Sequence, residues 1–435
     1  MTSGLSVTPP SDCVVLGGGI SGCAAAHFLR GMGAKVTLVE RDNDLGGIAR
    51  SYQLGGQIYD FGPHMLHATN SNTMELYKQF DIRELDYYAK MSYSGTLDGL
   101  VDFPFSLDTI FQLPVDIAKQ VVAELYALDS KRRDSTNLET NLISAFGETL
   151  YRLCNEGYSR KFWGMAPTDV PSNGAASWIS FRATDKRLYA EWQAYPNGGF
   201  NSIYDGLTTG VQVVTATATG LGDVRNGRLT AIKTTAGDIG GDHFVSTLTP
   251  EVLWPVEPDA RLKYIGKVVV ALRLKEGPFN PVGIGGIYFP QERWRFNRIV
   301  EYPAMTERSY PDLPDGTVVT LEYPLVPWKP EQIFSDQFYI DDAVAQIAQL
   351  RPVEVVGARV HRHESIYPFR DDGQLALYRG YRARLAEFEN LSMTGRYGNF
   401  VYVNMNHCIE MAAKVVAGLW GVSAEEVFQQ AAALC

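Results

Sequence analysis

Two histidines stand three residues apart in the segment FGPHMLHATN, at His64 and His67, in a chain that has seven histidines. Imidazoles at this spacing can bind a metal ion, act as a general acid and base, or pack as neutral core residues. A second pair, His361 and His363 in HRHE, would suggest a metal site if it were helical. Its β-like surroundings predict an exposed strand pair instead, with no third ligand in view, so we expect no metal.

The most specific local pattern is a glycine-rich turn. Gly17, Gly19 and Gly22 form GxGxxG after an apolar run and at the start of a helical pattern, and Glu40 ends the next strand-like run. The first glycine permits a tight turn, the second lets a pyrophosphate approach the backbone, and the third lets helix and strand pack. A carboxylate at this distance binds ribose hydroxyls. These residues therefore predict a dinucleotide site.

A double glycine, Gly46 and Gly47, follows the second strand-like run in RDNDLGGIARS. The pattern E-x-x-x-x-x-GG resembles the large flavoprotein oxidoreductase class and favours FAD over NAD. The two glycines would bring backbone close to the flavin end of the cofactor.

The elements that must position these residues begin with a βαβ unit: a strand at 13–16, a helix ending near Gly31 or Gly33, and a strand at 35–40. We predict an α/β fold, with a Rossmann-type FAD-binding domain, an inserted helical domain and an antiparallel β-sheet domain. Short strands in 210–249 should extend the first sheet, and a strand-like run at 399–403 precedes a helical tail. The predicted boundaries are 1–75, 196–255 and 363–435 for the FAD-binding domain, 76–195 for a mainly helical insertion with a mobile loop, and 256–362 for the antiparallel substrate domain.

Composition sets outer limits on function. With 435 residues, 45% hydrophobic and 20% charged, the chain reads as a globular protein of two or three domains. A net charge of -10 without a basic run argues against nucleic acid or an anionic membrane as the main partner. The five cysteines form no CxxC pair, and no signal peptide or membrane-spanning run stands out, so the cytoplasm is the expected location.

A series of segments links the whole chain to a known family. They are, in order, FGPHMLHATN, DFPF, GETLYRLCNEGYSRKFWG, YPNGGF, NRIVEY, LEYPL, IYPFRDD and GRYGNFVYVNMN. Together they resemble the UDP-galactopyranose mutase family, from about Val14 to the last helix. The resemblance implies a non-redox isomerisation of a nucleotide-diphosphate sugar. In that family N5 of reduced FAD attacks the anomeric carbon and forms a covalent adduct, which opens and recloses as the other ring form.

The resemblance also carries residue roles onto this chain. Arg182 and Arg298 would bind the diphosphate, and His67, supported by His64, would lie against the isoalloxazine and tune the flavin. Further cofactor contacts are implied for Val213, Arg396 and Met405. Substrate contacts are implied for Asp102, Tyr158, Phe162, Trp163, Trp192, Tyr323 and Tyr367.

The departures from the family pattern lie at positions that the resemblance assigns to substrate binding. Phe162 replaces a glutamine that could bond a pyrimidine edge, Asp102 replaces an asparagine, and Trp192 replaces a tyrosine. The segment before Arg182 is longer than in the bacterial mutases, which leaves Arg187 as an alternative for the loop arginine. The sugar and the base therefore stay open.

Two other functions compete with the mutase. One is an FAD-dependent oxidoreductase of the amine-oxidase or desaturase type, which shares GxGxxG, the YPNGGF turn and the domain plan. The other is a catalytically idle flavin- or nucleotide-binding protein that works through a partner. The resemblance leaves a homodimer open, and no residue pattern predicts its interface.

Overall fold

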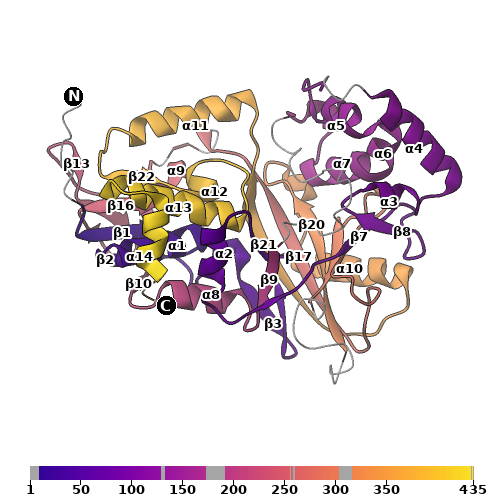
Figure 1. The fold of residues 1–435 in the computed structure, drawn as a ribbon, viewed down its shortest axis with the longest axis horizontal. Coiled ribbons are helices and arrows are strands. Elements are labelled where there is room, and N and C mark those ends of the chain that lie inside the picture. Colours follow the sequence, from indigo (N-terminus) through magenta and orange to yellow (C-terminus); the bar gives the residue numbers. More distant parts are fainter. Residues whose placement is uncertain are drawn as a thin grey trace.

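The computed structural model describes residues 9–128, 133–172, 192–254, 256–257, 260–302, 316–432 and 434. Two large sheets dominate it, a parallel sheet that carries the N-terminus and an antiparallel sheet beside it, with a helical block at the far end (Figure 1). The predicted α/β architecture is confirmed. In the described residues no helix is both long enough and apolar enough to cross a bilayer.

The first sheet has five parallel strands in the order β10-β2-β1-β16-β22. Its central strand reads DCVVL, and an apolar run of this kind suits a strand that is covered on both faces. The predicted βαβ unit is present almost as expected. The strands are β1 (Asp12–Leu16), β2 (Lys35–Glu40), β10 (Gln212–Thr215), β16 (His243–Ser246) and β22 (Leu391–Met393), and the first helix is α1 (Ile20–Gly31).

The two faces of this sheet have different covers. Cys13 and Val15 of β1 pack in one buried cluster with α1, whereas Val14 and Leu16 pack in another cluster with Ile232. The helical side holds α8 (Phe200–Leu207), α13 (Met405–Trp420) and α14 (Ala424–Ala432). The opposite side holds a three-stranded sheet of β11 (Ala218–Leu221), β14 (Ala231–Thr234) and β15 (Ile239–Gly240), with α9 (Pro250–Leu253) and the hairpin β12 (Val224–Arg225) and β13 (Arg228–Leu229).

The prediction that every short strand of 210–249 extends the first sheet is therefore wrong. Only β10 and β16 join it. Strands of two to four residues carry too little pattern to show which partner they pair with, because pairing is decided by distant residues.

The second sheet has seven strands in the order β21-β17-β20-β19-β18-β7-β8. All neighbours are antiparallel except β18 and β7, which run parallel. One face packs on α10 (Asp336–Leu350) through an apolar cluster that includes Val268, Val270 and Tyr339. The strands are β7 (Ala89–Ser92), β8 (Leu100–Phe103), β17 (Tyr264–Leu274), β18 (Gly286–Tyr288), β19 (Arg298–Glu301), β20 (Thr317–Leu325) and β21 (Val355–Pro368).

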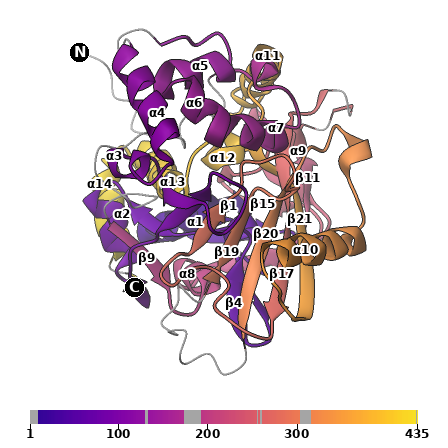
Figure 2. The same ribbon diagram turned by 90° about the vertical axis from the view of Figure 1, so that its right-hand side faces the viewer.

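The helical block closes the end of the second sheet, as the turned view shows (Figure 2). It contains α3 (Leu107–Ile110), α4 (Val115–Ala127), α5 (Leu138–Phe146), α6 (Glu148–Leu150), a π-helical turn (Tyr151–Glu156) and α7 (Gly157–Trp163). A mainly helical stretch from residue 76 was predicted, but 82–103 supply β6 (Ile82–Glu84), β7 and β8. These strands of three or four residues are too short for a clear alternation of polar and apolar side chains.

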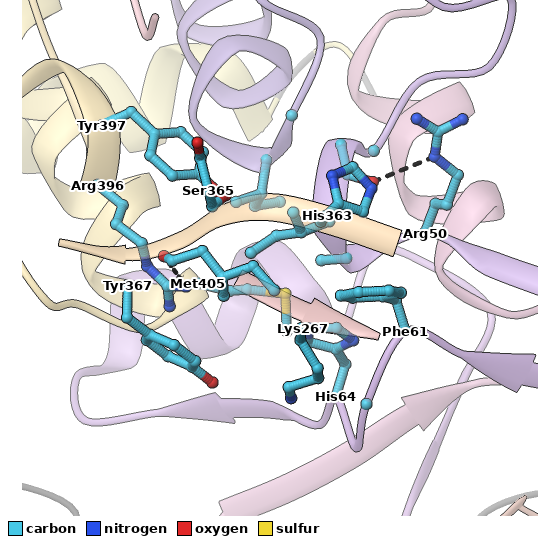
Figure 3. Close-up of a pocket in the computed structure, with 18 of the residues that line it drawn as sticks. Arg50, Phe61, His64, Lys267, His363, Ser365, Tyr367, Arg396, Tyr397 and Met405 are labelled. Atoms are coloured by element: carbon cyan, nitrogen blue, oxygen red, sulfur yellow. Dashed lines mark hydrogen bonds between the residues drawn. The ribbon is translucent and has the colours of Figure 1, made fainter. Parts of the chain in front are cut away.

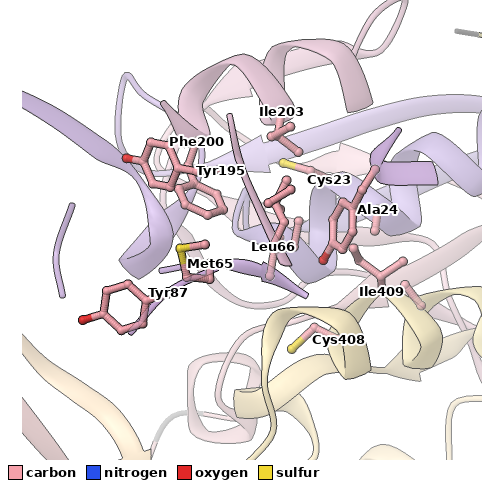
Figure 4. Packing of buried hydrophobic residues seen from close by; sticks show 14 of the residues in the cluster. Cys23, Ala24, Met65, Leu66, Tyr87, Tyr195, Phe200, Ile203, Cys408 and Ile409 are labelled. Carbon is pink, nitrogen blue, oxygen red and sulfur yellow. The ribbon is translucent and has the colours of Figure 1, made fainter. Parts of the chain in front are cut away.

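A core of apolar residues holds the segment FGPHMLHATN, residues 61–70, in place (Figure 4). Met65 and Leu66 pack with Cys23 of α1, Phe200 of α8 and Ile409 of α13, all in one buried cluster. This segment carries His64 and His67. Further elements of the fold are β3 (Ser51–Leu54), β4 (Gln57–Asp60), β5 (Leu66–Ala68), α2 (Ser71–Tyr77), β9 (Trp192–Pro196), α11 (Asp372–Leu385) and α12 (Gly395–Gly398).

Candidate functional site

A cavity of about 1440 Å³ runs between the two sheets. Its glycine-turn end is bordered by Gly17, Gly19, Glu40, Gly46 and Gly47. Its sheet end is bordered by Phe103, Tyr158, Phe162, Lys267, Tyr288, Arg298, Glu322 and Tyr367. His64, His67, Arg396 and Met405 border its middle. Residues from distant parts of the sequence thus meet in one space.

At the glycine-turn end two of the three glycines, Gly17 and Gly22, have no room for a side chain. Gly17 has a φ of 94°, and a Cβ on Gly22 would lie 1.8 Å from the Gly17 carbonyl oxygen. Nothing lies within 4 Å of a Cβ built on Gly19, so that glycine faces open space. No side chain caps the start of α1, whose N–H groups and dipole attract an anion. Gly22 itself supports the turn without bordering the cavity.

The carboxylate of Glu40 is held in place beside this turn. Its Oε2 accepts a bond from the Gly18 N–H at 2.6 Å, and its Oε1 accepts one from the Asp42 N–H at 3.0 Å. A carboxylate fixed at the end of β2 is where a ribose would be bound. The turn, the free helix start and this acid fit a dinucleotide.

The double glycine folds across the first turn. The Gly46 N–H donates to the Gly18 carbonyl at 2.7 Å, and Gly46 and Gly47 have φ angles of 112° and 59°. Arg50 donates from Nε to the Gly47 carbonyl at 3.1 Å, the bond drawn in Figure 3, and also pairs with Asp42. This second turn brings backbone to the side of the cavity that leads to the histidines.

Both histidines of FGPHMLHATN border the cavity and are neutral at neutral pH. Burial lowers the pKa of His64 to about 3, and the nearby charges of Lys267 and Arg396 add to the effect. Burial lowers the pKa of His67 to about 4, with a further contribution from His407. The Nδ1 of His64 makes no hydrogen bond to any described residue. Within the described chain no group of histidine, cysteine and carboxylate side chains could hold a metal.

Arg396 places a partly buried cation in the middle of the cavity (Figure 3). Its Nε and Nη2 donate to the Val403 carbonyl at 3.0 and 2.6 Å, and its guanidinium lies over the rings of Tyr367 and Tyr402 at 5.4 and 5.6 Å. No described carboxylate lies within ion-pair distance of it. Its charge is therefore available to an anionic ligand.

The run at 399–403, predicted to be strand-like, is a loop that follows α12. Phe400 has a φ of 47° and its buried ring packs on Tyr264 and Tyr378. A positive φ is costly for an aromatic residue, so tertiary packing sets this conformation. The loop brings Tyr402 and Val403 to the cavity wall.

The sheet end is organised by one buried carboxylate shared between two cations. Glu322 accepts bonds from Arg298 Nε and Nη2 at 3.0 and 2.8 Å and from Lys267 Nζ at 2.6 Å. Arg298 also donates from Nη1 to the Tyr288 hydroxyl at 2.7 Å. Burial alone would raise the pKa of Glu322, but Arg298 and then Lys267 outweigh it and lower the pKa to about 2. The three side chains carry a net positive charge beside the cavity.

Lys267 and Glu322 were not among the predicted site residues. Each had a signal in the sequence: Lys267 interrupts the apolar run YIGKVVVALRL, and Glu322 precedes the tyrosine of LEYPL. A lysine or glutamate inside a buried strand needs a partner. The partner could not be identified, because the two residues meet only through the pairing of β17 with β20.

Tyr323 borders the cavity, but its ring points into the core, away from the cluster around Glu322. Successive residues of a strand point to opposite faces, and Glu322 takes the cavity face. The Tyr323 ring packs against Phe296 and Tyr339, at centroid distances of 6.4 and 5.2 Å. Burial and then the Asp342 carboxylate raise its pKa well above the usual value, which places its hydroxyl near α10.

Aromatic rings cover the rest of the sheet end. Tyr158 and Phe162 project from one face of α7 and stack with a 13° interplanar angle at 6.1 Å. Tyr288 lies 6.0 Å from Tyr158, and Tyr367 lies 5.2 Å from Phe162. Trp163, which was predicted to join them, points elsewhere and packs on Phe369 at 5.8 Å in the core.

Three further predicted contacts do not border the cavity. Asp102 pairs with Lys90 at 2.8 Å and accepts a bond from Gln112, and Trp192 donates to Glu84 at 2.9 Å. Val213 stands on the edge strand β10 and is 43% exposed. Each position was assigned from the resemblance, which does not give the direction in which a strand residue points its side chain. Arg182 and Arg187 lie outside the described residues.

Comparisons with known proteins match two parts of the chain to families. Residues 15–80 match a family described as an NAD(P)-binding Rossmann-like domain, and residues 154–340 match the family described as UDP-galactopyranose mutase. The dTDP-fucopyranose mutase of Escherichia coli is 22% identical over 204 residues, which cover 45% of this chain and 53% of that protein. The chain thus spans about half the length of the curated mutases it matches.

A solved structure extends the likeness to the whole fold. The crystal structure of reduced UDP-galactopyranose mutase superposes with a TM-score of 0.79 at 19% identity, covering 98% of this chain and 99% of that one. An L-amino-acid oxidase of Crotalus adamanteus is 33% identical over 181 residues, 34% of this chain and 35% of that protein. The resemblance to the mutase family that the sequence predicts is confirmed.

Proposed function

We propose that this chain, with its mutase-family match over residues 154–340, is an FAD-dependent isomerase that interconverts the pyranose and furanose forms of a nucleotide-diphosphate sugar. The observation that carries the proposal is the shape of one cavity. A dinucleotide turn stands at its start, and a buried cation cluster with stacked aromatic rings stands at its other end. A nucleotide sugar bound at the sheet end would have its sugar toward the middle of the cavity.

The residues present fit FAD. Glu40 would bind the ribose, and the turn at Gly17 and Gly19 with the start of α1 would bind the pyrophosphate. The ring system would then lie between His64 and Met405, in the middle of the cavity. Bound FAD in its reduced form supplies N5 as a nucleophile toward the anomeric carbon, which is the covalent chemistry that the family resemblance implies.

The protein's own contribution at the sheet end is electrostatic. When the bond to the anomeric carbon breaks, the departing diphosphate gains charge, and preorganised cations stabilise that charge without moving. Arg298 is preorganised in this sense, because Glu322 and Tyr288 fix its guanidinium through three bonds. Lys267 balances the charge of Glu322, so that the cluster keeps a net positive charge.

The histidines act as neutral groups in this proposal. With pKa values of about 3 and 4, His64 and His67 carry no charge at neutral pH. A neutral imidazole can donate one bond and accept one, which suits the edge of a flavin. We propose that they tune the flavin and do not move protons between solvent and sugar.

The base would meet the aromatic pair on α7. Tyr158 and Phe162 offer ring faces, and Phe162 has no donor or acceptor with which to bond a base edge. We therefore propose a nucleotide sugar without assigning uracil or thymine. Arg182 as a second diphosphate arginine, a homodimer and a cytoplasmic location remain predictions from the sequence.

The test is a conversion assay on the FAD-loaded protein. The protein is reduced with dithionite and incubated with UDP-, dTDP- and GDP-hexopyranoses, and the ring forms are separated by chromatography. We expect at least one of these sugars to reach a mixture of pyranose and furanose. No conversion of any of them would sink the proposal, and anaerobic reduction of the oxidised flavin by an amine would support an oxidase instead.

A further inference from the structure

Lys161 lies on α7 between the two aromatic residues that face the sheet end. Its Nζ donates to the Phe289 carbonyl at 2.6 Å and to the Phe296 carbonyl at 2.8 Å. Phe289 directly follows β18, and Phe296 lies two residues before β19. One ammonium therefore joins α7 to both arms of the β18–β19 connection.

The two arms carry side chains of the sheet end. Tyr288 is the residue before Phe289, and Arg298 begins β19. The arms are also bonded to one another, since the Phe289 N–H donates to the Asn297 carbonyl at 2.9 Å. Holding both carbonyls thus fixes Tyr288 and Arg298 as one body relative to α7.

The link is unusual because a partly buried ammonium donates to carbonyls and not to a carboxylate. No described carboxylate lies within ion-pair distance of Lys161. Burial lowers its pKa to about 7, and Glu292 offsets part of that effect. A second polar link between α7 and this connection is an exposed pair, Arg160 with Glu292 at 3.7 Å, which contributes little in water.

We propose that Lys161 is a positioning residue that sets the distance between the Tyr158–Phe162 ring pair and Arg298, and so sets the affinity for the nucleotide-diphosphate part of the substrate. The inference rests on the proposed function for the identity of the ligand. It adds a residue that touches neither the ligand nor the cofactor, and it assigns that residue to binding.

The test measures binding without turnover. Calorimetry on the oxidised, FAD-loaded protein gives Kd for UDP-galactopyranose and dTDP-fucopyranose. The variants are Lys161→Met, which keeps the length but removes the donors, and Lys161→Arg, which keeps the charge. The control is Lys329→Met: Lys329 Nζ donates to the carbonyl of Gly164, which ends α7, and touches neither arm of the β18–β19 connection.

Lys161→Met should raise Kd by about tenfold or more, since small misplacements of binding groups are costly. Lys161→Arg and Lys329→Met should stay within about threefold of the unmodified protein, because the first keeps charge-assisted bonds and the second leaves the connection intact. Flavin content should be unchanged in all of them. Equal Kd values for Lys161→Met and the unmodified protein, or an equal loss in Lys329→Met, would overturn the assignment.

A pH series separates positioning from simple loss of packing. Glu292 from the connection is the charged group that acts on Lys161, and the Arg160–Glu156 pair lies next to Lys161 in the sequence. An arginine at this position keeps its charge throughout the pH range, and so does the diphosphate diester of each probe. Kd should therefore rise between pH 6 and 8.5 in the unmodified protein and stay flat in Lys161→Arg.

A flat profile in both proteins would count against the positioning role. If the unmodified protein binds neither probe and converts none of the sugars of the conversion assay, the proposed function fails together with this inference. If it binds and Lys161→Met binds equally well, only the inference about Lys161 fails.

Discussion

The two ends of the cavity are built in different ways. The glycine-turn end uses backbone, and most of its residues come from the first 50 positions, where missing side chains make the space. The sheet end uses charged side chains, and its central bonds join Lys267, Arg298 and Glu322 from three strands. A short sequence motif can encode the first kind of site. The second exists only when distant strands pair in register.

The two ends also handle charge differently. An open helix start offers partial charges that need no burial of an ion. The sheet end buries full charges, which costs several kcal/mol for each ion unless partners compensate. Glu322 compensates both cations there, so removing any member of the cluster leaves a buried charge with fewer partners.

The largest expected effect is at the glycine-turn end. In Gly22→Ala the new Cβ would lie 1.8 Å from the Gly17 carbonyl oxygen. Overpacking of a side-chain atom against the backbone in this way lowers the free energy of unfolding by about 3 kcal/mol or more. We expect the purified variant to lack flavin absorbance. Gly380→Ala is the matched control, because nothing lies within 4 Å of its added Cβ, and it should retain full flavin content. Normal flavin content in Gly22→Ala would refute the backbone account.

The next effect is at the sheet end. Arg298→Ala should lower kcat/KM by about 100-fold to 1000-fold, the usual loss when a preorganised donor to developing charge is removed, and should leave flavin content unchanged. Arg295→Ala, a change at an exposed arginine of the same segment, should stay within about threefold. Loss of flavin from Arg298→Ala would show that the two ends are not separable.

A smaller effect is expected on the pH dependence of stability, in which two buried carboxyl groups, Glu322 and Asp60, should act in opposite directions. Arg298 and Lys267 lower the pKa of Glu322 to about 2, against an ordinary value of 4.5. The stability that this group contributes is present above pH 4.5 and is lost as pH falls toward 2. Burial raises the pKa of Asp60 to about 8, although bonds from Ser51 and Tyr195 oppose the rise. Its contribution is full below pH 3.8 and is lost as pH rises toward 8.

The change of stability with pH can be measured by thermal unfolding at a series of pH values. The unmodified protein is compared with Asp60→Asn and with Glu322→Gln. The Tm difference between the unmodified protein and Asp60→Asn should fall as pH rises from 4 to 8. The difference for Glu322→Gln should shrink only below pH 4.5. Parallel curves for both variants would contradict the assignment of one carboxyl as neutral and the other as paired.

The smallest effect is expected for a residue that the sequence placed in the substrate site. Asp102→Asn should change kcat/KM by no more than about threefold, because the structure pairs Asp102 with Lys90 away from the cavity and partly exposed pairs contribute little. A tenfold loss in this variant would restore the role that the resemblance implies.

Sequence reasoning succeeded where contacts are local. The strand, glycine turn, helix and Glu40 of the first 40 residues stand where the pattern places them, since each step depends on neighbours in the chain. It failed where the role of a residue depends on the direction of its side chain or on a packing partner that is distant in the sequence. The rings of Tyr323 and Trp163 pack into the core, and Phe400, in a run predicted to be strand-like, has a positive φ that its packing imposes.

Lys267 shows what the sequence could not supply. A lone lysine in an apolar run signals a buried partner, but Glu322 lies 55 residues away and is one of many carboxylates. Only the register of β17 with β20 selects it. Pairs of this kind are found from strand pairing and not from motifs.

The central claim is that one cavity uses flavin without net oxidation or reduction of the sugar. The most direct measurement follows the flavin spectrum and the sugar ring forms together in an anaerobic cuvette, with reduced or oxidised FAD-loaded protein. We predict many turnovers per flavin in the reduced protein, a flavin that is still reduced when the ring forms stop changing, and no turnover in the oxidised protein. Oxidation of the flavin in step with product, or equal turnover by the oxidised protein, would contradict the account.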